Sequence, residues 1–560
     1  MAAPWHMICA ALLSLLPATA GAQVQVNQTF NLQGPSPSIG VQGTVQSGDL
    51  PPTSGSVAGA VQAVVFDPAN GNIYTGTPGG GIWVSSNGGA AWTPLTDNKA
   101  SLSIYSLSLD PTDASGRTLI AGTGVSSNGT IGALSDPVQQ FRSSGGLQNG
   151  LLYSQDGGKS WSTLGSGVLA GQNISAVAAR GSVIMAGTSI MSEFAYQPAP
   201  GTISGALYRS MDGGKTFIQV SGGAGTGLPP GPITSLLGDP TNPNKFYAAV
   251  SSPTATSAGY ASTAIYMSNN AGASWTQVFN ASNSTNYNGN STVTGNGQTM
   301  IKLATGPDGT VAAGVVDVST GRVSGLFWSN NPSTAAGAWT AVKTPPGDQL
   351  NYIRQAPWNF AIAIDPSNPN LVYVSGDETK KDQTTYSLAA YRISVTSQTV
   401  TSLTLTNTAS NTFPHSDSRA MAFDASGNLI LTSDGSIYLR TNPQTDGGDW
   451  ERMNGNLSAF EVYKTAYDAV SKRLTVAAQD NGVAIQSTPG SAQWNAVQGA
   501  DGLNVVINDT TLTGKSAIYS TFDSLGGFSR IILDANGNQT SPNTAAFGYG
   551  AEVTCDHSDC

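Results

Sequence analysis

Apolar residues in this chain come in short runs that alternate with polar residues, and Gly, Pro, Asn and Asp separate the runs. One such segment is Leu236–Tyr247, where two apolar stretches flank Gly238-Asp239-Pro240-Thr241-Asn242-Pro243. Short alternating runs bounded by turn residues are typical of β-strands. No window combines helix-forming residues with the apolar spacing of a helix. We therefore expect an all-β protein.

The strand–turn–strand pattern returns further along the chain. It is clear again in Ile364–Tyr373 and in Phe423–Leu429, each centred on Asp, Pro, Asn or Gly. Asp and Asn bond to nearby backbone groups and Pro fixes φ, so these residues favour tight turns. Each copy is followed by a variable loop, a third strand and a second turn, which indicates a four-stranded unit.

The second turn is the clearest repeat in the sequence. Its best copy is Tyr153-Ser154-Gln155-Asp156-Gly157-Gly158-Lys159-Ser160-Trp161, which we call the Gly-Gly turn, and related copies span 85–92, 210–217 and 268–275. The copies close on Trp92, Trp161, Phe217 and Trp275, and stretched versions end at Trp339, Trp450 and Trp494. A period of this length with about four strands per unit predicts a β-propeller.

About nine blade-like units can be counted over residues 57–545. One unit supplies strands at Ile362–Asp365 and Ala390–Ile393 without a Gly-Gly turn, and the last has a degenerate turn at Asp523–Phe528. Two closures fit this count: a single ring of about ten blades, or seven blades followed by part of a second ring. We favour the single ring, because the unit without the turn keeps the period.

The Gly-Gly turn resembles the Asp-box, or BNR repeat, of the sialidase, sortilin and xyloglucanase superfamily. The resemblance covers most of residues 57–500, and it implies that the turn is a structural hairpin between the two outer strands of a blade. Asp156 and Asp212 are then expected to cap the amides of their turns, and the closing aromatic residues to pack the outer edge of the blade. In this superfamily the ligand lies on the opposite face.

Strand counting places the long loops on that opposite face. Since the strands of a blade alternate in direction, the loops between second and third strands share a face with the connections between blades. The long insertions are Gly124–Gly150, Ser189–Gly205, Ser251–Ala264 and Gly376–Leu388. Long loops on a rigid scaffold often carry binding, so Arg354 and Trp358 are candidate ligand contacts.

The densest polar set of the same face lies in the C-terminal half. It comprises His415-Ser416-Asp417-Ser418-Arg419, Ser433-Asp434-Gly435, Gln479-Asp480-Asn481-Gly482 and Gly499-Ala500-Asp501-Gly502. Asp434, Asp480 and Asp501 are candidate catalytic carboxyl groups, because glycoside cleavage needs an acid and a base with separated pKa values. His415, Asp417, Arg419, Gln479 and Asn481 are candidate ligand contacts, and a structural cation near His415 and Asp417 is an alternative. A third interpretation is that Asp-Gly and Asp-Asn-Gly only form turns.

This run resembles that of secreted bacterial proteins of the sortilin/xyloglucanase-like group, with three departures. Arg419 replaces a second His, Ser436 replaces a Gly, and Ala500 precedes Asp501. The Arg-Ile-Pro element of sialidases is absent. The Asp of the xyloglucanase Thr-Asp-x-Gly-Gly element is also missing, because the equivalent segment is Thr77-Pro78-Gly79-Gly80-Gly81.

The two ends of the chain differ from the repeats. Residues 1–22 have the short apolar core and small-residue site of a signal peptide, and 23–56 form a strand and a Gly/Pro/Ser-rich linker. In the tail, 546–560, Cys555 and Cys560 are expected to form a disulfide, with a metal site as the alternative. No later apolar run is long enough to span a membrane.

Composition limits the partners. The net charge is −10, charged residues make up 10% of the chain, and no Lys/Arg cluster occurs, which argues against nucleic acid. We expect a secreted, monomeric protein without a resident metal or cofactor. The leading hypothesis is a binding module for a glycan or an extracellular protein, and the alternative is a glycoside hydrolase.

Overall fold

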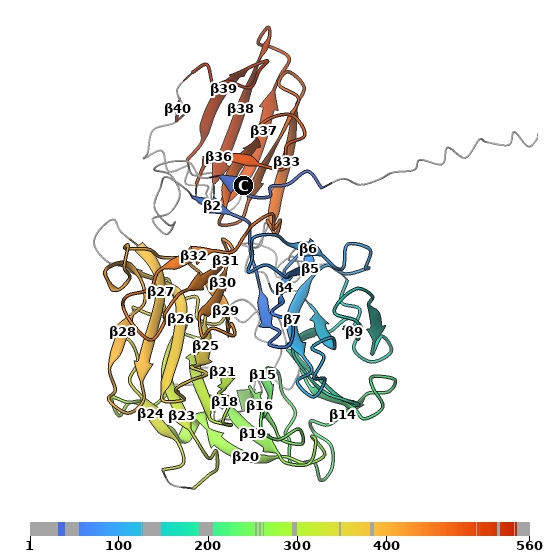
Figure 1. Cartoon of the computed structure of the whole chain (residues 1–560), viewed down its shortest axis with the longest axis vertical. Coiled ribbons are helices and arrows are strands. Elements are labelled where there is room, and N and C mark those ends of the chain that lie inside the picture. Colours follow the sequence, from blue (N-terminus) through green and yellow to red (C-terminus); the bar gives the residue numbers. More distant parts are fainter. Residues whose placement is uncertain are drawn as a thin grey trace, which may run out of the picture. The chain divides into compact units, whose positions relative to one another are not determined.

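The structure is a computed structural model, and it is all-β (Figure 1). It describes residues 32–39, 55–124, 126, 147–189, 205–251, 255–256, 259–260, 263–293, 299–335, 337–346, 349–380, 386–499, 501–522, 527–541 and 544–545. The predicted signal peptide and the tail with Cys555 and Cys560 lie outside these ranges. Within them the helical elements are two short 3₁₀ turns, η2 (Ala281–Asn283) and η3 (Leu405–Asn407).

The strands form nine antiparallel blades, numbered here in chain order. Blade one contains β3 (Ala63–Phe66), β4 (Ile73–Thr77), β5 (Gly81–Ser85) and β6 (Thr93–Pro94). Blade two contains β7 (Ile104–Leu109), β8 (Leu119–Thr123), β9 (Leu151–Ser154) and β10 (Ser162–Leu164). Blade three contains β11 (Asn173–Arg180), β12 (Val183–Ser189), β13 (Leu207–Ser210) and β14 (Ile218–Gln219).

Blade four carries an additional two-stranded ribbon. Its strands are β15 (Ile233–Gly238), β16 (Phe246–Val250), β19 (Ala264–Ser268) and β20 (Thr276–Asn280), and the ribbon is β17 (Ala255–Thr256) with β18 (Gly259–Tyr260). Blade five contains β21 (Thr299–Thr305), β22 (Val311–Asp317), β23 (Arg322–Ser329) and β24 (Thr340–Val342). Blade six, the unit without a Gly-Gly turn, contains β25 (Ala361–Ile364), β26 (Leu371–Lys380), β27 (Tyr386–Ser394) and β28 (Val400–Ser402).

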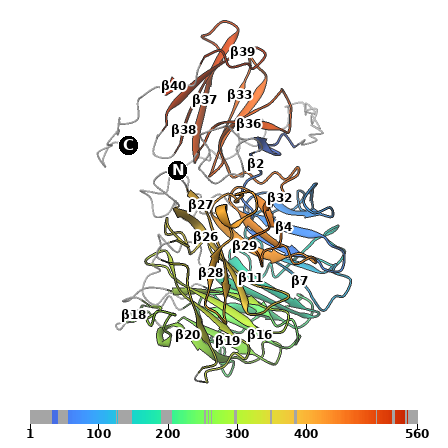
Figure 2. The ribbon, with the colours of Figure 1, turned by 60° about the vertical axis from the view of Figure 1, so that its left-hand side comes forward.

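The last three blades come from the C-terminal part of the sequence. Blade seven contains β29 (Ser418–Phe423), β30 (Leu429–Ser433), β31 (Ile437–Arg440) and β32 (Trp450–Arg452). Blade eight contains β33 (Val462–Asp468), β34 (Arg473–Ala478), β35 (Gly482–Gln486) and β36 (Trp494–Gln498). Blade nine contains β37 (Gly502–Asn508), β38 (Lys515–Phe522), β39 (Ser529–Asp534) and β40 (Thr544–Ala545), which Figure 2 shows as one twisted sheet.

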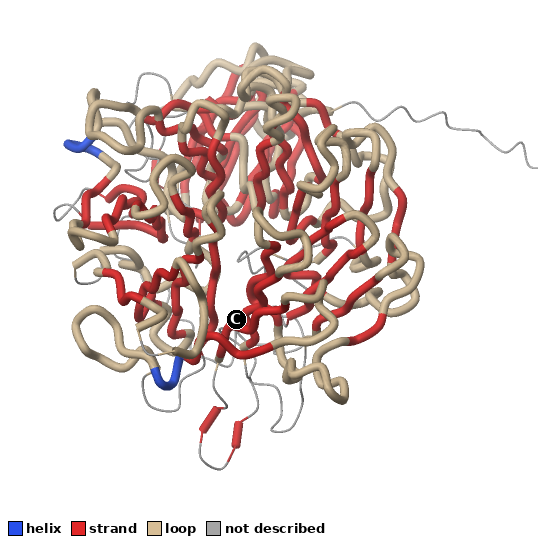
Figure 3. Tube along the Cα trace, turned by 60° about the horizontal axis from the view of Figure 1, so that its bottom comes forward, coloured by secondary structure: helices blue, strands red, loops and turns tan. Residues whose placement is uncertain are grey.

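Seven blades close a ring, so the expectation of one larger ring is wrong. Neighbouring inner strands contact each other from β3 through β29, and β29 contacts β3 in turn. The closing contact is apolar: Val64 and Trp83 of blade one share a buried cluster with Ile430 and Ile437 of blade seven. Figure 3 shows the strands of the ring set around a common centre. Blades eight and nine are not part of this ring, and they pack on each other through Val483, Val505 and Ile531.

Burial decreases from the second strand of a blade to the fourth. The second strands β4, β8, β16, β22 and β30 are buried at every position, whereas β10 and β14 are mostly exposed. A strand covered on both faces is buried at every position, which is why these strands consist mainly of apolar residues and glycine without a regular polar alternation. The core is thus a series of layers between adjacent blades.

Glycines in the second strands let the blades approach each other. A Cβ on Gly122 would lie 2.6 Å from Cγ2 of Ile174, and one on Gly187 would lie 2.5 Å from Cγ2 of Ile233, each at the start of the next inner strand. Gly76 has the same relation to Ile104. The aliphatic residue of one blade therefore fills the space left by the missing side chain of the blade before it.

The Gly-Gly turns bond mainly within themselves. In the best copy the amide of Gly158 donates to Ser154 Oγ (2.9 Å), and the amide of Ser160 donates to Asp156 Oδ1 (2.9 Å). Asp212 accepts from the amide of Thr216 (3.0 Å) in the same way. The aspartate thus caps the residue four positions later, and the serine before it caps the second glycine. Asn87 and Asn270 occupy the aspartate position in two other copies.

The closing aromatic residues directly precede the outer strand of their own blade, and they pack there against the neighbouring blade. Trp92 joins the buried cluster shared with blade seven and donates from Nε1 to the carbonyl of Met453 (2.6 Å). Trp161 packs against blade one, Phe217 against the cluster of blades two and three, and Trp275 against blade three.

Two predicted boundaries differ from the structure. Part of the expected linker forms β1 (Ser38–Ile39) and β2 (Ser56–Val57), and β1 pairs in parallel with β36, so blade eight has six strands. The segment Gly376–Leu388 is largely an extension of the β26–β27 hairpin, with a bulge between Ser375 and Glu378. Most of the predicted degenerate turn, Asp523–Phe528, lies outside the described residues; by chain order it falls between β38 and β39, the second and third strands of blade nine.

Candidate functional site

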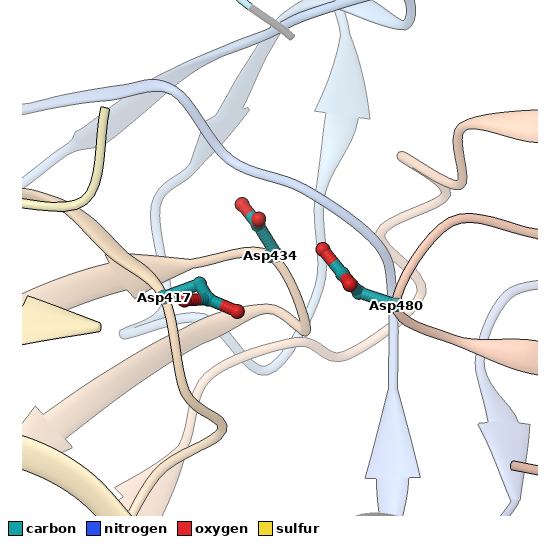
Figure 4. A group of neighbouring side chains, drawn as sticks. All are labelled: Asp417, Asp434 and Asp480. Atoms are coloured by element: carbon teal, nitrogen blue, oxygen red, sulfur yellow. The ribbon is translucent and has the colours of Figure 1, made fainter. Parts of the chain in front are cut away.

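The predicted carboxylates come together at the ends of strands from two blades. Asp417 precedes β29, Asp434 follows β30, and Asp480 follows β34. One carboxylate oxygen from each lies within 4.8 Å of the others, and Figure 4 shows the three side chains as neighbours. Asp501, in the connection from β36 to β37, joins the group by accepting the amide of Asp480 at Oδ1 (2.7 Å).

Arg419 compensates one of these charges inside the protein. Its Nε donates to Asp434 Oδ1 in an ion pair whose two side chains are 1% and 2% exposed. Its Nη1 donates to Gln62 Oε1 (2.9 Å) and to the carbonyl of Ser126 (2.8 Å). Arg419 therefore fixes Asp434 in place and also joins β29 to blades one and two.

Asp417 is buried and has an unusual backbone. Its φ is +66°, a region that favours glycine, and its amide donates to the carbonyl of Asp377 (3.1 Å). Nδ2 of the buried Asn359 donates to Asp417 Oδ1 (2.9 Å). Burial raises the pKa of Asp417 well above its ordinary value, and the charge of Asp434 raises it further.

Asp480 is partly buried and also has a positive φ, +52°. Burial raises its pKa well above the ordinary value, and the neighbouring carboxylates of Asp501 and Asp434 add to the shift. Several like charges in one low-dielectric place cannot all ionise without compensation.

The remaining predicted contacts of this run hold the blades together. Asn481 Nδ2 donates to the carbonyls of Asp434 (3.0 Å) and Gln479 (2.7 Å), which ties blade eight to blade seven. The buried ring of His415 lies between two carbonyl oxygens, with Nδ1 3.1 Å from that of Ser416 and Nε2 3.2 Å from that of Asp480. A Cβ on Gly435 would overlap this ring, so the Asp-Gly step is needed for its close approach.

Two further acidic residues that were not predicted as site residues, Asp377 and Glu378, lie beside Asp417. The fully buried Asp377 lies in the bulge of β26 and accepts the amides of Gln355 (2.8 Å), Glu378 (2.6 Å) and Ile353 (3.4 Å). Burial raises the pKa of Asp377 to about 6, and burial with the charge of Asp377 raises the pKa of Glu378 to about 7. The available signal is Gly376-Asp377-Glu378 directly after an apolar run, at the start of the predicted loop Gly376–Leu388.

Those amides anchor the loop that carries Arg354 and Trp358. Arg354 is exposed at its tip with a φ of +66°, next to exposed Tyr352 and Ile353. Lys380 Nζ lies 5.8 Å from the ring centre of Tyr352. Trp358 is half-buried and lines the central cavity. The loop therefore offers an exposed aromatic and cationic surface next to the carboxylate group.

The central cavity has a volume of about 640 Å³. The inner strands of the ring line it with hydroxyl groups, among them Ser106, Ser175 and Thr234, and with the side chains of Lys302, Trp358 and Arg419. Two of the predicted ligand contacts thus face one cavity, while Arg354 lies outside its lining.

The chain is similar to known proteins in its fold. No protein-family model matches the chain, and no curated protein sequence does. A GH74 enzyme from Niastella koreensis has a similar structure (TM-score 0.57, 16% identity, 90% of this chain and 68% of that one). An ancestral GH74 enzyme gives 0.54, with 14% identity over 86% of this chain and 61% of that one. The fold is a β-propeller.

A third similar structure is the GH74 xyloglucanase from Xanthomonas campestris, with a TM-score of 0.50, 17% identity, and coverage of 88% of this chain and 74% of that one. The propeller thus spans roughly two thirds of the length of these GH74 structures. Helices of the length and hydropathy required to cross a bilayer do not occur in the part of the chain described here.

Proposed function

We propose that this protein is a secreted glycan-binding β-propeller that takes its ligand on the face of the blade-to-blade connections. The observation that favours binding over catalysis is that the carboxylates are buried, already hydrogen-bonded and close together. Asp417 and Asp434 are buried and bonded to Asn359 and Arg419, and their oxygens lie within 4.8 Å of Asp480. Glycosidases need two carboxyl groups about 5–5.5 Å or 6.5–9.5 Å apart on either side of the scissile bond.

The exposed loop supports a sugar ligand. Tyr352 and Ile353 are 36% and 39% exposed, and Arg354 and Lys380 add cationic donors beside them. Aromatic rings with polar neighbours suit sugars, which have one apolar face and a rim of hydroxyls. Trp358 and the hydroxyl-lined cavity extend this surface inward.

Xyloglucan is the first ligand to test, because one of the similar structures is a xyloglucanase. The expected export rests on residues 1–22, which have the pattern of a signal peptide. We take Asp156 and Asp212 as structural residues of Asp-box turns, on the strength of the bonds within each turn.

The test is retention in native gels cast with xyloglucan, mixed-linkage glucan or galactomannan, with reducing-end release measured in parallel. We expect retention without product, weakened about tenfold by Tyr352→Ala, in line with the loss of one stacking contact. Met211→Ala is the matched control, because Met211 is 50% exposed in the Gly-Gly turn of blade three, on the opposite face. Retention that is absent on all three glycans, or unchanged in Tyr352→Ala, would overturn the proposal.

A second candidate function is glycoside hydrolysis with Asp480 and Asp501. It is favoured by one observation: Asp480 is partly exposed and its amide bonds to the carboxylate of Asp501, which places two acidic groups side by side. Sugar release by the wild type that Asp480→Asn abolishes would establish this function and reject the pure binding module.

A further inference from the structure

We propose that Asp417, Asp434 and Asp480 hold one calcium ion, which joins blade seven to blade eight. The inference concerns the architecture and does not depend on the proposed glycan ligand. Asp417 and Asp434 come from the two ends of the β29–β30 hairpin, and Asp480 follows β34.

The separation of the oxygens fits one ion of this size. Calcium binds oxygen at about 2.3–2.6 Å, so two ligands on opposite sides of the ion are about 4.6–5.2 Å apart. The three carboxylate oxygens lie within 4.8 Å of one another, and Figure 4 shows that the three side chains come from separate chain segments. One ion between them would therefore need little rearrangement.

The three carboxylates and the guanidinium of Arg419 together carry two uncompensated negative charges when all are ionised. Three carboxylates face one another, and the guanidinium of Arg419, paired with Asp434, neutralises one of them. The neighbouring acids have other partners: Asp377 accepts three backbone amides and Asp501 accepts that of Asp480. A divalent cation would bring the three carboxylates and the arginine to neutrality, which burial favours.

Two buried oxygens beside the group have no hydrogen-bond partner among the described residues. One is Oδ2 of Asp434, a residue only 1% exposed, and the other is the amide oxygen of Asn481, which is 8% exposed. The amide nitrogen of Asn481 donates to the carbonyl of Asp434, so this side chain lies directly at the site. Buried polar atoms are almost always paired, and an oxygen without a donor can be satisfied by a cation.

The donor set points to calcium among the common cations. All candidate ligands are oxygens, and hard oxygen ligands select Ca²⁺, Mg²⁺ or Mn²⁺ over zinc or copper. His415 is not available as a ligand in this geometry, because both ring nitrogens lie beside carbonyl oxygens. Magnesium keeps several waters in a strict octahedron, whereas calcium accepts irregular sets of protein oxygens.

Calcium binding would also bear on the candidate functions. A carboxylate that ligates a cation cannot carry the proton of a general acid, so an occupied site would remove Asp480 from the hydrolytic scheme.

The experiment uses the whole protein, freed of metal with EGTA and dialysed, in calorimetric titration and thermal unfolding with CaCl2. We expect one calcium per chain, a Tm raised by several degrees, and at least a tenfold loss of affinity in Asp480→Asn and in Asp417→Asn. Asp446→Asn is the control, because Asp446 is 59% exposed and paired with Arg392 away from the site. Its affinity should equal that of the wild type.

Two results would overturn the calcium proposal. One is a titration that shows no binding heat and no Tm shift up to about 10 mM calcium, a concentration above the range of weak extracellular sites. Equal affinity in the wild type and in Asp480→Asn would also overturn it. If Asp417→Asn does not fold, the wild-type stoichiometry and the partly exposed Asp480 still decide. Glycan retention is measured separately in EGTA, so either proposal can fail alone.

Discussion

At the scale of single residues, the ion pair of Arg419 with Asp434 determines how much of the negative charge of the carboxylate group is compensated within the protein. Asp434 would be an isolated buried carboxylate without Arg419, and the same arginine reaches Gln62 and Ser126. Its replacement removes an ion pair and two anchoring hydrogen bonds at once, so Arg419 is a positioning residue of the site.

We predict that Arg419→Met destabilises the protein by about 3–5 kcal/mol, because it leaves the Asp434 charge buried and unpaired. The free energy of unfolding in guanidinium chloride measures the effect. The double variant Arg419→Met with Asp434→Leu should recover most of the loss, since two apolar groups need no charge partner. A single variant as stable as the wild type would show that the ion pair is dispensable.

A second prediction concerns the Gly-Gly turn of blade two. The hydroxyl and amide of Ser160 lower the pKa of Asp156 to about 2, below the ordinary value near 3.9. A lowered folded pKa gives stability that is present above about pH 4 and is lost as the pH falls towards 2. The side chain is partly exposed, so the effect is below about 1 kcal/mol.

Two variants of Asp156 distinguish the contribution of its hydrogen bonds to the turn from that of its negative charge. Asp156→Asn should be nearly neutral at pH 7 and should flatten this part of the pH profile, because Asn87 and Asn270 already cap their turns in this way. Asp156→Ala should cost about 1 kcal/mol at pH 7, and less as the pH falls towards 2, because the wild type then loses the contribution of the ionised carboxylate. Thermal unfolding from pH 2 to pH 7 gives both results, and an unchanged acid slope in Asp156→Asn would contradict the assignment.

At the scale of elements, the second strand of each blade sets the distance to the next blade. Its glycines receive the first aliphatic side chain of the following inner strand, as Gly187 receives Ile233. The glycine leaves space for the aliphatic side chain of the next blade, so adjacent blades can pack closely. This explains why a second strand such as β12 is almost completely buried and contains small residues.

We predict that Gly187→Ala destabilises the protein by about 1–3 kcal/mol, because the added methyl group must displace Ile233 in a packed layer. Gly167→Ala is the control, since no atom lies within 4 Å of its added Cβ. Denaturant unfolding of both variants checks the prediction. Equal stability would mean that the layers between blades can separate without cost.

The strands and turns can be predicted from the sequence, whereas most contacts between blades cannot. The Gly-Gly turns and Asp-Pro turns mark hairpins, so the sequence predicts Asp434 and Asp480 at strand ends, and in the structure they follow β30 and β34. Asp377 was missed because a bulge in an extended hairpin has no local signature. Ring closure was misjudged because contacts of β29 with β3 join distant segments and leave no mark in the repeat period.

At the scale of the whole molecule, the closed ring and the two additional blades differ in how they bury their inner strands. In the ring, every inner-strand residue is buried or half-buried. In blades eight and nine, Tyr467 and Val506 are each 57% exposed on β33 and β37.

We therefore predict that Tyr467→Lys changes the free energy of unfolding by less than about 0.5 kcal/mol, as for other exposed positions. Ile301→Lys, at a fully buried inner-strand position of blade five, should prevent stable folding. Circular dichroism and thermal unfolding distinguish them. A large loss in Tyr467→Lys would mean that another part of the protein covers this strand in solution.

The parallel pairing of β1 with β36 has a kinetic consequence. Ser38 lies beside Trp494, roughly 450 residues later in the chain. During synthesis β1 leaves the ribosome early together with β2, and β36 becomes available only after most of the intervening polypeptide has followed. Pairing over such a sequence separation is slow, because the loop-closure entropy is lost before any contact forms. The sheet of blade eight should thus be the last to complete, and protection of the Trp494 amide from hydrogen exchange should report the end of folding.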